Sequence, residues 1–185
     1  MKFTDPNRVM EMSHPDGLSV LEASHFGPME QNGGYPRGFL DWLYPLMGVE
    51  DPDSVVHLCS GSIKRGVTVD IRPEMEPRIV SDCRDTKITA NTVRWVVADP
   101  PPMPIYNEII YGIPSKFPKS EEILTEAHRI LVPGGKVAIL CFAQPDAGPG
   151  YRLIGIYALL LGELVIRGLF LYEKDETALD SAHAA

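Results

Sequence analysis

The chain has 185 residues, a formal net charge of −8 at pH 7 and a sequence pI near 5.1. That length suits one domain that buries its core without disulfides or a metal. The net negative charge argues against general electrostatic binding of nucleic acid, which normally requires a basic face. A local basic cluster is not excluded, but solvated loop charges are the better interpretation of Lys64, Arg65, Arg72, Arg78 and Arg84.

The first third of the chain predicts an arm followed by a helix. Residues 1–34 are irregular, and only 18–26 reads as a short strand, so we expect a surface arm or lid. Pro36 suits the first position of a helix, and apolar residues then recur at helical spacing as far as Met47. Pro45 should kink or end that helix.

Four short apolar runs follow, at 55–59, 67–71, 78–82 and 93–98. They are continuous rather than alternating, which is typical of parallel strands covered on both faces. A parallel crossover normally needs about a dozen residues and a helix. The connections 60–66 and 72–78 are shorter, yet extended chain of that length can still return along a short strand. We therefore expect a parallel sheet that has lost the helices between strands 1–2 and 2–3.

Loss of those helices predicts a bare apolar face around the first three strands. The helix after Pro36 covers part of it, and large exposed apolar patches usually mark an interface. We expect the N-terminal arm or a second subunit to cover the remainder, which would make the protein a homodimer.

The second half predicts an alternation of helices and strands. Ser120 caps a helix with one apolar stripe, stopped at 133–135, and a strand follows at 137–142. We expect a helix at 151–161 and a last, antiparallel strand at 164–172. The fold class is thus α/β, a doubly wound and mostly parallel sheet over 35–174, with a disordered tail at 175–185.

Cysteine usage and the termini favour a cytoplasmic protein. Cys59, Cys83 and Cys141 are odd in number and widely spaced, so neither a disulfide framework nor a metal site is indicated. We interpret them as small buried hydrophobic residues. The N-terminus lacks the apolar core of a signal peptide. Glu163 and Arg167 interrupt the apolar stretch 153–172, which argues against a membrane span.

Polar residues gather where the predicted strands end. The first strand is followed by small residues, and the next three end at Asp70, Asp82 and Asp99. One acid at a strand end is ordinarily a turn residue, but ligands of such sheets bind at this edge. Asp70 can hold the hydroxyls of a ribose, and Asp82 can accept from an adenine amino group. Pro100 and Pro101 hold Asp99 at a rigid strand tip, either as a strand stop or as a site of hydrogen-bond acceptors.

These motifs resemble class I S-adenosylmethionine-dependent methyltransferases, in a shortened form that covers about 54–172. The residues at 58–62, 69–70, 81–85 and 129–136 look like family motifs, and Asp99-Pro100-Pro101 is most like the fourth motif of amino-methylating DNA methyltransferases. The first motif departs by having one glycine, and by His57 where an acid is common. Pro102 stands where the family has an aromatic residue, and Tyr106 is the nearest substitute.

The resemblance implies S-adenosyl-L-methionine as the cofactor. Its contacts would come from Cys59, Ser60, Gly61, Ser62, Asp70, Ile71, Asp82, Cys83, Arg84 and Asp99. Asp99, Pro100, Pro101 and Tyr106 would be catalytic, with the Asp99 carboxylate and the Pro100 carbonyl accepting from an exocyclic amine.

The substrate implied is DNA, at adenine N6 or cytosine N4. The target base would leave the stack and lie against Tyr35, Tyr106 or Tyr111. Two alternatives remain, namely a methyltransferase acting on a small-molecule or protein amine, and a non-catalytic subunit that binds the cofactor.

Overall fold

Nine strands of one sheet and two α-helices make up the part of the chain that the structure describes. The computed structural model describes residues 12–13, 19–26, 34–101, 103–104, 112, 117–161 and 165–175. The elements are β1 Met12–Ser13, β2 Ser19–Phe26, α1 Phe39–Met47, β3 Val56–Leu58, β4 Val67–Asp70, β5 Ile79–Val80, β6 Val93–Ala98, α2 Ser120–Ile130, β7 Leu131–Cys141, β8 Tyr151–Leu161 and β9 Val165–Lys174. Single 3₁₀ turns lie at Pro52–Ser54 and Pro73–Met75.

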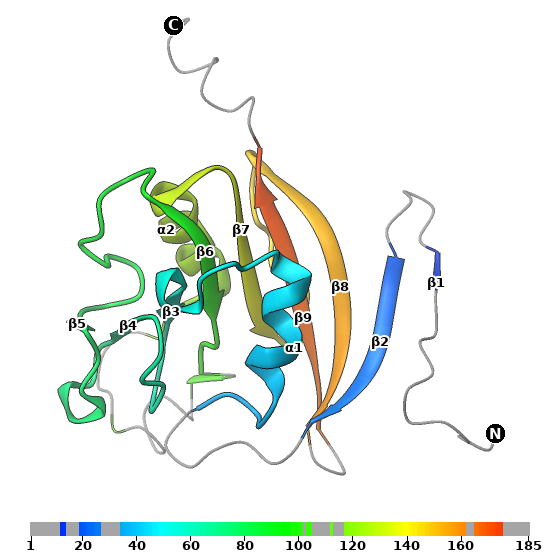
Figure 1. Ribbon diagram of the computed structural model, residues 1–185, viewed down its shortest axis with the longest axis horizontal. Coiled ribbons are helices and arrows are strands. Elements are labelled where there is room, and N and C mark those ends of the chain that lie inside the picture. The colour runs from blue at the N-terminus through cyan, green and yellow to red at the C-terminus, as the bar shows by residue number, and fades with distance from the viewer. Residues whose placement is uncertain are drawn as a thin grey trace, which may run out of the picture.

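The sheet is mostly parallel, as predicted. Its strand order is β1-β2-β8-β9-β7-β6-β3-β4-β5 (Figure 1). The strands β5, β4, β3, β6 and β7 pair in parallel, whereas β9 is antiparallel to both β7 and β8. No α-helix lies within 59–66 or 71–78, which confirms that the first two crossovers have lost theirs.

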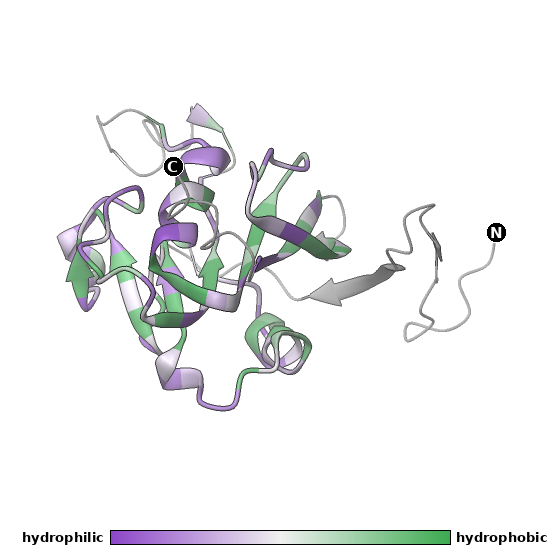
Figure 2. Ribbon diagram, turned by 90° about the horizontal axis from the view of Figure 1, so that it is seen from above, coloured by the Kyte–Doolittle hydropathy of each residue, from purple (hydrophilic) through white to green (hydrophobic). Residues whose placement is uncertain are grey.

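The two helices lie on opposite faces of the sheet (Figure 2). On one face α1 packs Phe39, Leu43 and Met47 against β6, β7, β8 and β9. On the other face, α2 buries the predicted apolar stripe against the opposite sides of the same strands. Alternate side chains of β6 therefore enter different cores: Val96 belongs to the α2 face and Val97 to the α1 face.

The prediction of a helix at 151–161 is wrong, because this segment is strand β8. It is joined to β9 by only three residues and pairs with it along almost its whole length. Period alone does not separate a buried strand from a buried helix. Gly155 and the β-branched neighbours Ile154 and Ile156 favour the strand. The apolar run 153–172 is therefore a hairpin within the sheet, and no helix in the described ranges is long and apolar enough to cross a membrane.

The strand predicted at 18–26 is present as β2. It pairs in parallel with β8 and so extends the sheet beyond the C-terminal hairpin. The expected lid role of residues 1–34 stays a prediction, and 176–185 lie outside the described residues.

A buried carboxylate ties the connection between β5 and β6 to α2. Glu126 of α2 accepts from the backbone N–H and hydroxyl of Thr86 at 2.8 and 2.6 Å, and from Arg129 at 2.7 Å. Arg129 also donates to the carbonyl of Ile88 at 2.8 Å. These bonds attach the 81–92 loop to α2, where it closes over the core.

The prediction of a bare apolar face at the first strands is wrong for β3 and β4. On the α1 face, His57 of β3 is fully buried and Thr68 of β4 is 2% exposed. The hydroxyls of Tyr35 and Tyr44 lie 3.2 Å from Nδ1 and Nε2 of His57, respectively. The chain thus covers this face itself over β3 and β4, whereas Val80 of β5 is 58% exposed. The homodimer stays a prediction.

His57 makes stability depend on pH. Burial lowers its pKa from 6.5 to about 4, so the unfolded chain binds more protons between these pH values. Stability contributed by neutral His57 is present above pH 6.5 and is lost as pH falls toward 4, by about 2 kcal/mol between pH 7 and pH 5. Urea unfolding at both pH values should show this loss, and His57→Gln should lack it. Equal losses in the two proteins would contradict the assignment.

Candidate functional site

The loop after β3 carries two buried hydroxyls without partners. Cys59 and Gly61 both have positive φ, 56° and 53°, which turns the chain sharply behind the strand. The Oγ atoms of Ser60 and Ser62 are buried and find no hydrogen-bond partner among the described residues. Since buried polar atoms are normally paired, these two hydroxyls are available for hydrogen bonds to a ligand or an ordered water at this loop.

Asp70, at the end of β4, is tied to this loop and to an arginine. Its Oδ2 accepts from the backbone N–H of Gly61 at 2.8 Å. Arg72 donates from its backbone N–H and Nε to Oδ1, both at 3.0 Å, and from Nη2 to Oδ2 at 3.2 Å. The carboxylate is 4% exposed, and these four bonds orient it fully.

Asp82 repeats this arrangement after β5. Arg84 donates from its backbone N–H and Nε to Oδ1 at 2.9 Å, and from Nη2 to Oδ2 at 2.6 Å. The bonds from Arg84 lower the pKa of Asp82. Arg84 also lies 3.5 Å from Glu122 of α2. The sequence Asp-x-Arg thus builds the same carboxylate turn at two neighbouring strand ends.

Two of the three cysteines meet between these turns. A hydrogen bond with Cys83 and burial raise the pKa of the Cys59 thiol. Both thiols pack against the core on the α2 face. Cys83 is buried, as predicted, and Cys59 is half-buried.

Asp99, at the end of β6, forms a buried ion pair that the sequence did not predict. Its Oδ1 lies 2.6 Å from Nη1 of Arg167 on β9, and the two side chains are only 7% and 4% exposed. Because β7 lies between β6 and β9, the guanidinium spans the end of β7 and donates from Nη2 to the Leu140 carbonyl at 2.9 Å. Burial raises the pKa of Asp99, and Arg167 opposes that rise.

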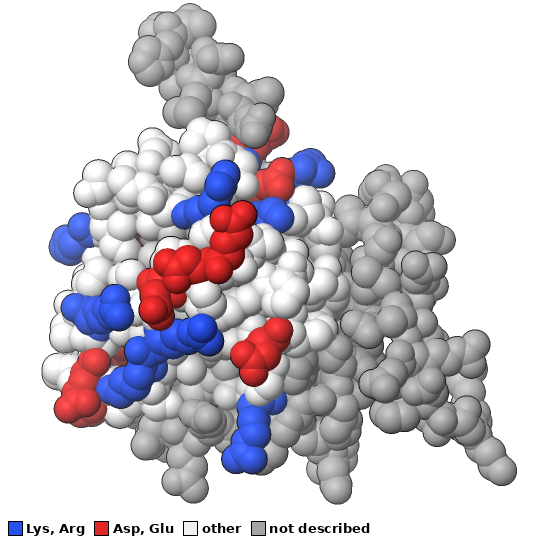
Figure 3. All heavy atoms as spheres, viewed as in Figure 1, with Lys and Arg blue, Asp and Glu red and all other residues white. Residues whose placement is uncertain are grey.

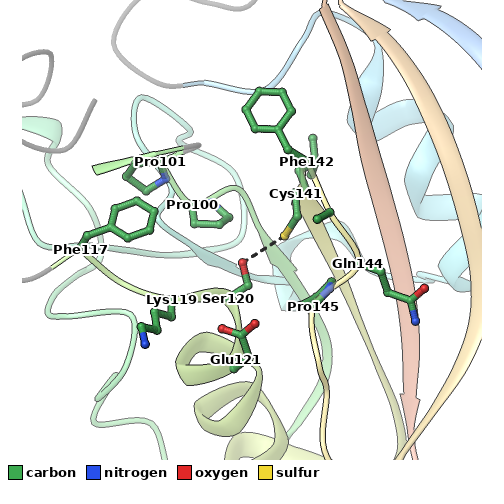
Figure 4. A pocket seen from close by; sticks show the side chains of 12 residues that line it. Pro100, Pro101, Phe117, Lys119, Ser120, Glu121, Cys141, Phe142, Gln144 and Pro145 are labelled. Carbon is green, nitrogen blue, oxygen red and sulfur yellow. Dashed lines mark hydrogen bonds between the residues drawn. The ribbon is translucent and has the colours of Figure 1, made fainter. Parts of the chain in front are cut away.

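Figure 4 shows a pocket of about 310 Å³ whose lining includes Leu140 and Phe142, both of which contact Arg167, and Pro100, which follows Asp99. Pro100 and Pro101 form one side, and the start of α2 and the segment after β7 form the others. Phe117 and Phe142 contribute aromatic rings to the lining. At the base, the Ser120 hydroxyl and Cys141 thiol are hydrogen-bonded at 3.2 Å.

The structure brings most of the predicted site residues to one edge of the sheet. The loop 59–62, Asp70, Asp82 and Asp99 all follow the carboxyl ends of parallel neighbours. Ile71 is 37% exposed there. Tyr106, Tyr111 and Pro102 lie outside the described residues.

Tyr35 is not a stacking candidate, because it is a core residue. It is 4% exposed, stacks on Phe39 and bonds His57 on the α1 face. Sequence reasoning missed Arg167 and the pairing role of Arg72, although the repeated Asp-x-Arg spacing was a usable signal for Arg72.

The basic cluster at 64–84 consists largely of paired charges. Lys64 lies 3.3 Å from Glu76, and Arg72 and Arg84 are bound to their own aspartates. Acidic and basic side chains are interspersed on the face seen in Figure 3. This agrees with loop charges rather than a basic nucleic-acid surface.

Comparison with known proteins gives the fold. Neither a scan of protein-family models nor a search of curated sequences finds a match to this chain. Solved structures do match. TrmN from Thermus thermophilus is 19% identical with a TM-score of 0.57, covering 77% of this chain and 50% of that one. The chain has the Rossmann-like fold of class I methyltransferases.

Two other structures agree. A putative methyltransferase, yhhF from Escherichia coli, is 9% identical with a TM-score of 0.51, and the match covers 91% of this chain and 99% of that one. A mutant of MtNAS in complex with S-adenosylmethionine is 13% identical with a TM-score of 0.50, over 74% and 60% of the two chains. The chain spans only about half the length of TrmN.

Removing one partner of the Asp99 pair should be costly, because it leaves the other charge buried. We expect Arg167→Met to lower the free energy of unfolding by about 3 kcal/mol, and the double variant Asp99→Leu, Arg167→Met to recover most of that loss. Arg152→Met, which breaks an ion pair whose arginine is 67% exposed, should cost under about 1 kcal/mol. Urea unfolding measures all three. Equal costs for Arg167→Met and Arg152→Met would contradict a desolvated pair.

Proposed function

We propose that this protein is an S-adenosylmethionine-dependent methyltransferase that acts on an exocyclic amino nitrogen of a nucleic-acid base. One observation carries the proposal. At the carboxyl edge of a methyltransferase sheet, unpartnered serine hydroxyls, two oriented carboxylates and the tip Asp99-Pro100-Pro101 occur side by side.

The residues at this edge fit S-adenosylmethionine. The orphan hydroxyls of Ser60 and Ser62 offer partners for its amino-acid end, Asp70 for the ribose and Asp82 with Cys83 for the adenine. Bound there, the cofactor supplies an electrophilic methyl group. The Asp70 carboxylate already holds four bonds, so ribose hydroxyls must exchange with those from the Arg72 guanidinium.

Asp99 and Pro100 orient the acceptor. A carboxylate oxygen of Asp99 and the Pro100 carbonyl accept the two N–H bonds of an amine, which localises the nitrogen lone pair and aims it. Asp99 can afterwards hold the proton that the nitrogen loses. No covalent intermediate on the protein is needed.

The adjoining pocket suits a planar ring. Its prolines and the rings of Phe117 and Phe142 offer flat apolar contacts, and Lys119 adds a positive charge at the pocket. Adenine and cytosine are planar and carry exocyclic amines, so DNA adenine N6 or cytosine N4 is the proposed target. Phe142 is 52% exposed and could receive a base removed from its stack.

A second function has one observation in its favour. The saturation of Asp70 by Arg72 is what a subunit that has lost activity would also show. Methyl transfer to a small-molecule or protein amine is the other alternative.

Transfer of a tritium-labelled methyl group from the cofactor tests the proposal. Plasmid and host DNA should gain label that nucleoside analysis places on N6 of adenine or N4 of cytosine. Asp99→Ala should reduce transfer by about 100-fold or more while cofactor binding is retained. Glu76→Gln, at an exposed carboxylate after β4, is the control and should leave transfer unchanged.

Each other outcome selects an alternative. Label on RNA, protein or small amines, but not on DNA, would overturn the substrate. Cofactor binding without transfer to any acceptor would indicate the non-catalytic subunit. Absence of cofactor binding would overturn both functions.

A further inference from the structure

We propose that Arg167 is a positioning residue of the acceptor site, which keeps Asp99 a charged and fixed hydrogen-bond acceptor. This inference rests on the proposed function, because it gives Arg167 a role toward the acceptor amine. The carboxylate and the guanidinium come from β6 and β9, two strands that β7 separates in the sheet. Nothing in the motif around Asp99 identifies its partner.

The guanidinium is held on several sides. Nη1 binds Asp99 at 2.6 Å and Nη2 donates to the Leu140 carbonyl at 2.9 Å. Its Cζ lies 5.9 Å from the centre of the Phe142 ring, within the range of a cation–π contact. One arginine therefore contacts the proposed acceptor carboxylate, the end of strand β7 and an aromatic ring of the pocket lining.

The pair is a fixed element rather than a latch. Both side chains are almost fully buried, so separating them would leave two unpaired charges in a low-dielectric region. Arg167 occupies one of about four lone-pair positions of the carboxylate. The remaining positions can accept from an amine while the pair stays closed, so the substrate has no need to displace Arg167.

Arg167 supplies the positive charge that faces Asp99 in the described part of the chain. The other titratable groups near the carboxylate are Tyr35 before α1, Cys59 after β3 and Cys141 at the end of β7. Burial is the largest cause of the raised pKa of Tyr35 and Cys141, and the hydrogen bond to Cys83 the largest for Cys59. These groups are neutral at pH 7 and give Asp99 no compensating charge.

Loss of Arg167 should therefore change the protonation of Asp99. Without the cation, burial alone acts on the carboxyl group, and a protonated Asp99 would lose acceptor capacity. In Arg167→Gln, the acid limb of methyl transfer should move up by at least about one pH unit. Arg167→Lys keeps the charge but loses the planar fork, so its profile should stay near that of the wild type while kcat falls and KM changes little.

The experiment combines two readouts on the full chain. ¹³C NMR of protein labelled at aspartate carboxyl carbons follows the Asp99 titration, which is assigned with Asp99→Asn, in wild type, Arg167→Gln and Arg167→Lys. Initial rates of labelled methyl transfer are measured from pH 5.5 to 9 in the same proteins. Arg152→Gln, at a largely exposed pair on β8, is the control and should alter neither readout.

The NMR readout separates this inference from the proposed function. A raised Asp99 titration in Arg167→Gln supports the inference even where no acceptor is methylated. An Asp99 titration unchanged by Arg167→Gln overturns it, as does an equal loss of transfer at every pH. If Arg167→Gln fails to fold, Arg167→Lys decides: a wild-type profile with reduced kcat supports the role, and unchanged kcat overturns it.

Discussion

Carboxylates held by arginines at the ends of parallel strands are the interaction on which this structure depends. Asp70, Asp82 and Asp99 close three of the strands that form the carboxyl edge, and each binds a guanidinium at hydrogen-bond distance. A carboxylate that is desolvated at such an edge needs a paired charge, and a bidentate arginine provides both charge and orientation. The edge is thus rigid before any ligand arrives.

The shortness of the connections explains why this edge is built from side chains. With no α-helix within 59–66 or 71–78, the turns after β3 and β4 cannot be supported by a helix beneath them. The Asp70 bond to the Gly61 N–H and the bonds from Arg72 take over that support. After β5, the Glu126 contacts with Thr86 hold the loop against α2. A reduced sheet can in this way keep the loop positions that a cofactor site requires.

The sequence predicted the parallel strands and the acidic residues at their carboxyl ends better than it predicted the segment 151–161 and the partner of Asp99. Continuous apolar runs ending in Asp70 and Asp99 indicated parallel strands, because most residues of β4 and β6 are buried on both faces. The run before Asp82 became the edge strand β5, in which Val80 is 58% exposed. The segment 151–161 was predicted as a helix because an apolar run that is buried on both faces suits a helix as well as a strand. Its pairing with β2 and β9 makes it a strand. Arg167 was not predictable as the partner of Asp99, because that contact depends on strand order rather than on spacing. The sequence also suggested Tyr35 as a stacking residue, but in the structure its hydroxyl contacts the buried His57.

Binding of S-adenosylmethionine at the carboxyl edge of β3, β4 and β5 can be tested by an NMR titration. Amide resonances of ¹⁵N-labelled protein would be followed as the non-reactive product S-adenosylhomocysteine is added. A cofactor site at this edge should give saturable shifts concentrated at 59–62, 70–72 and 82–84, with little change around Asn91 and Lys174 at the opposite end of the sheet. Binding that leaves those three loops unperturbed, or no binding at all, would contradict it.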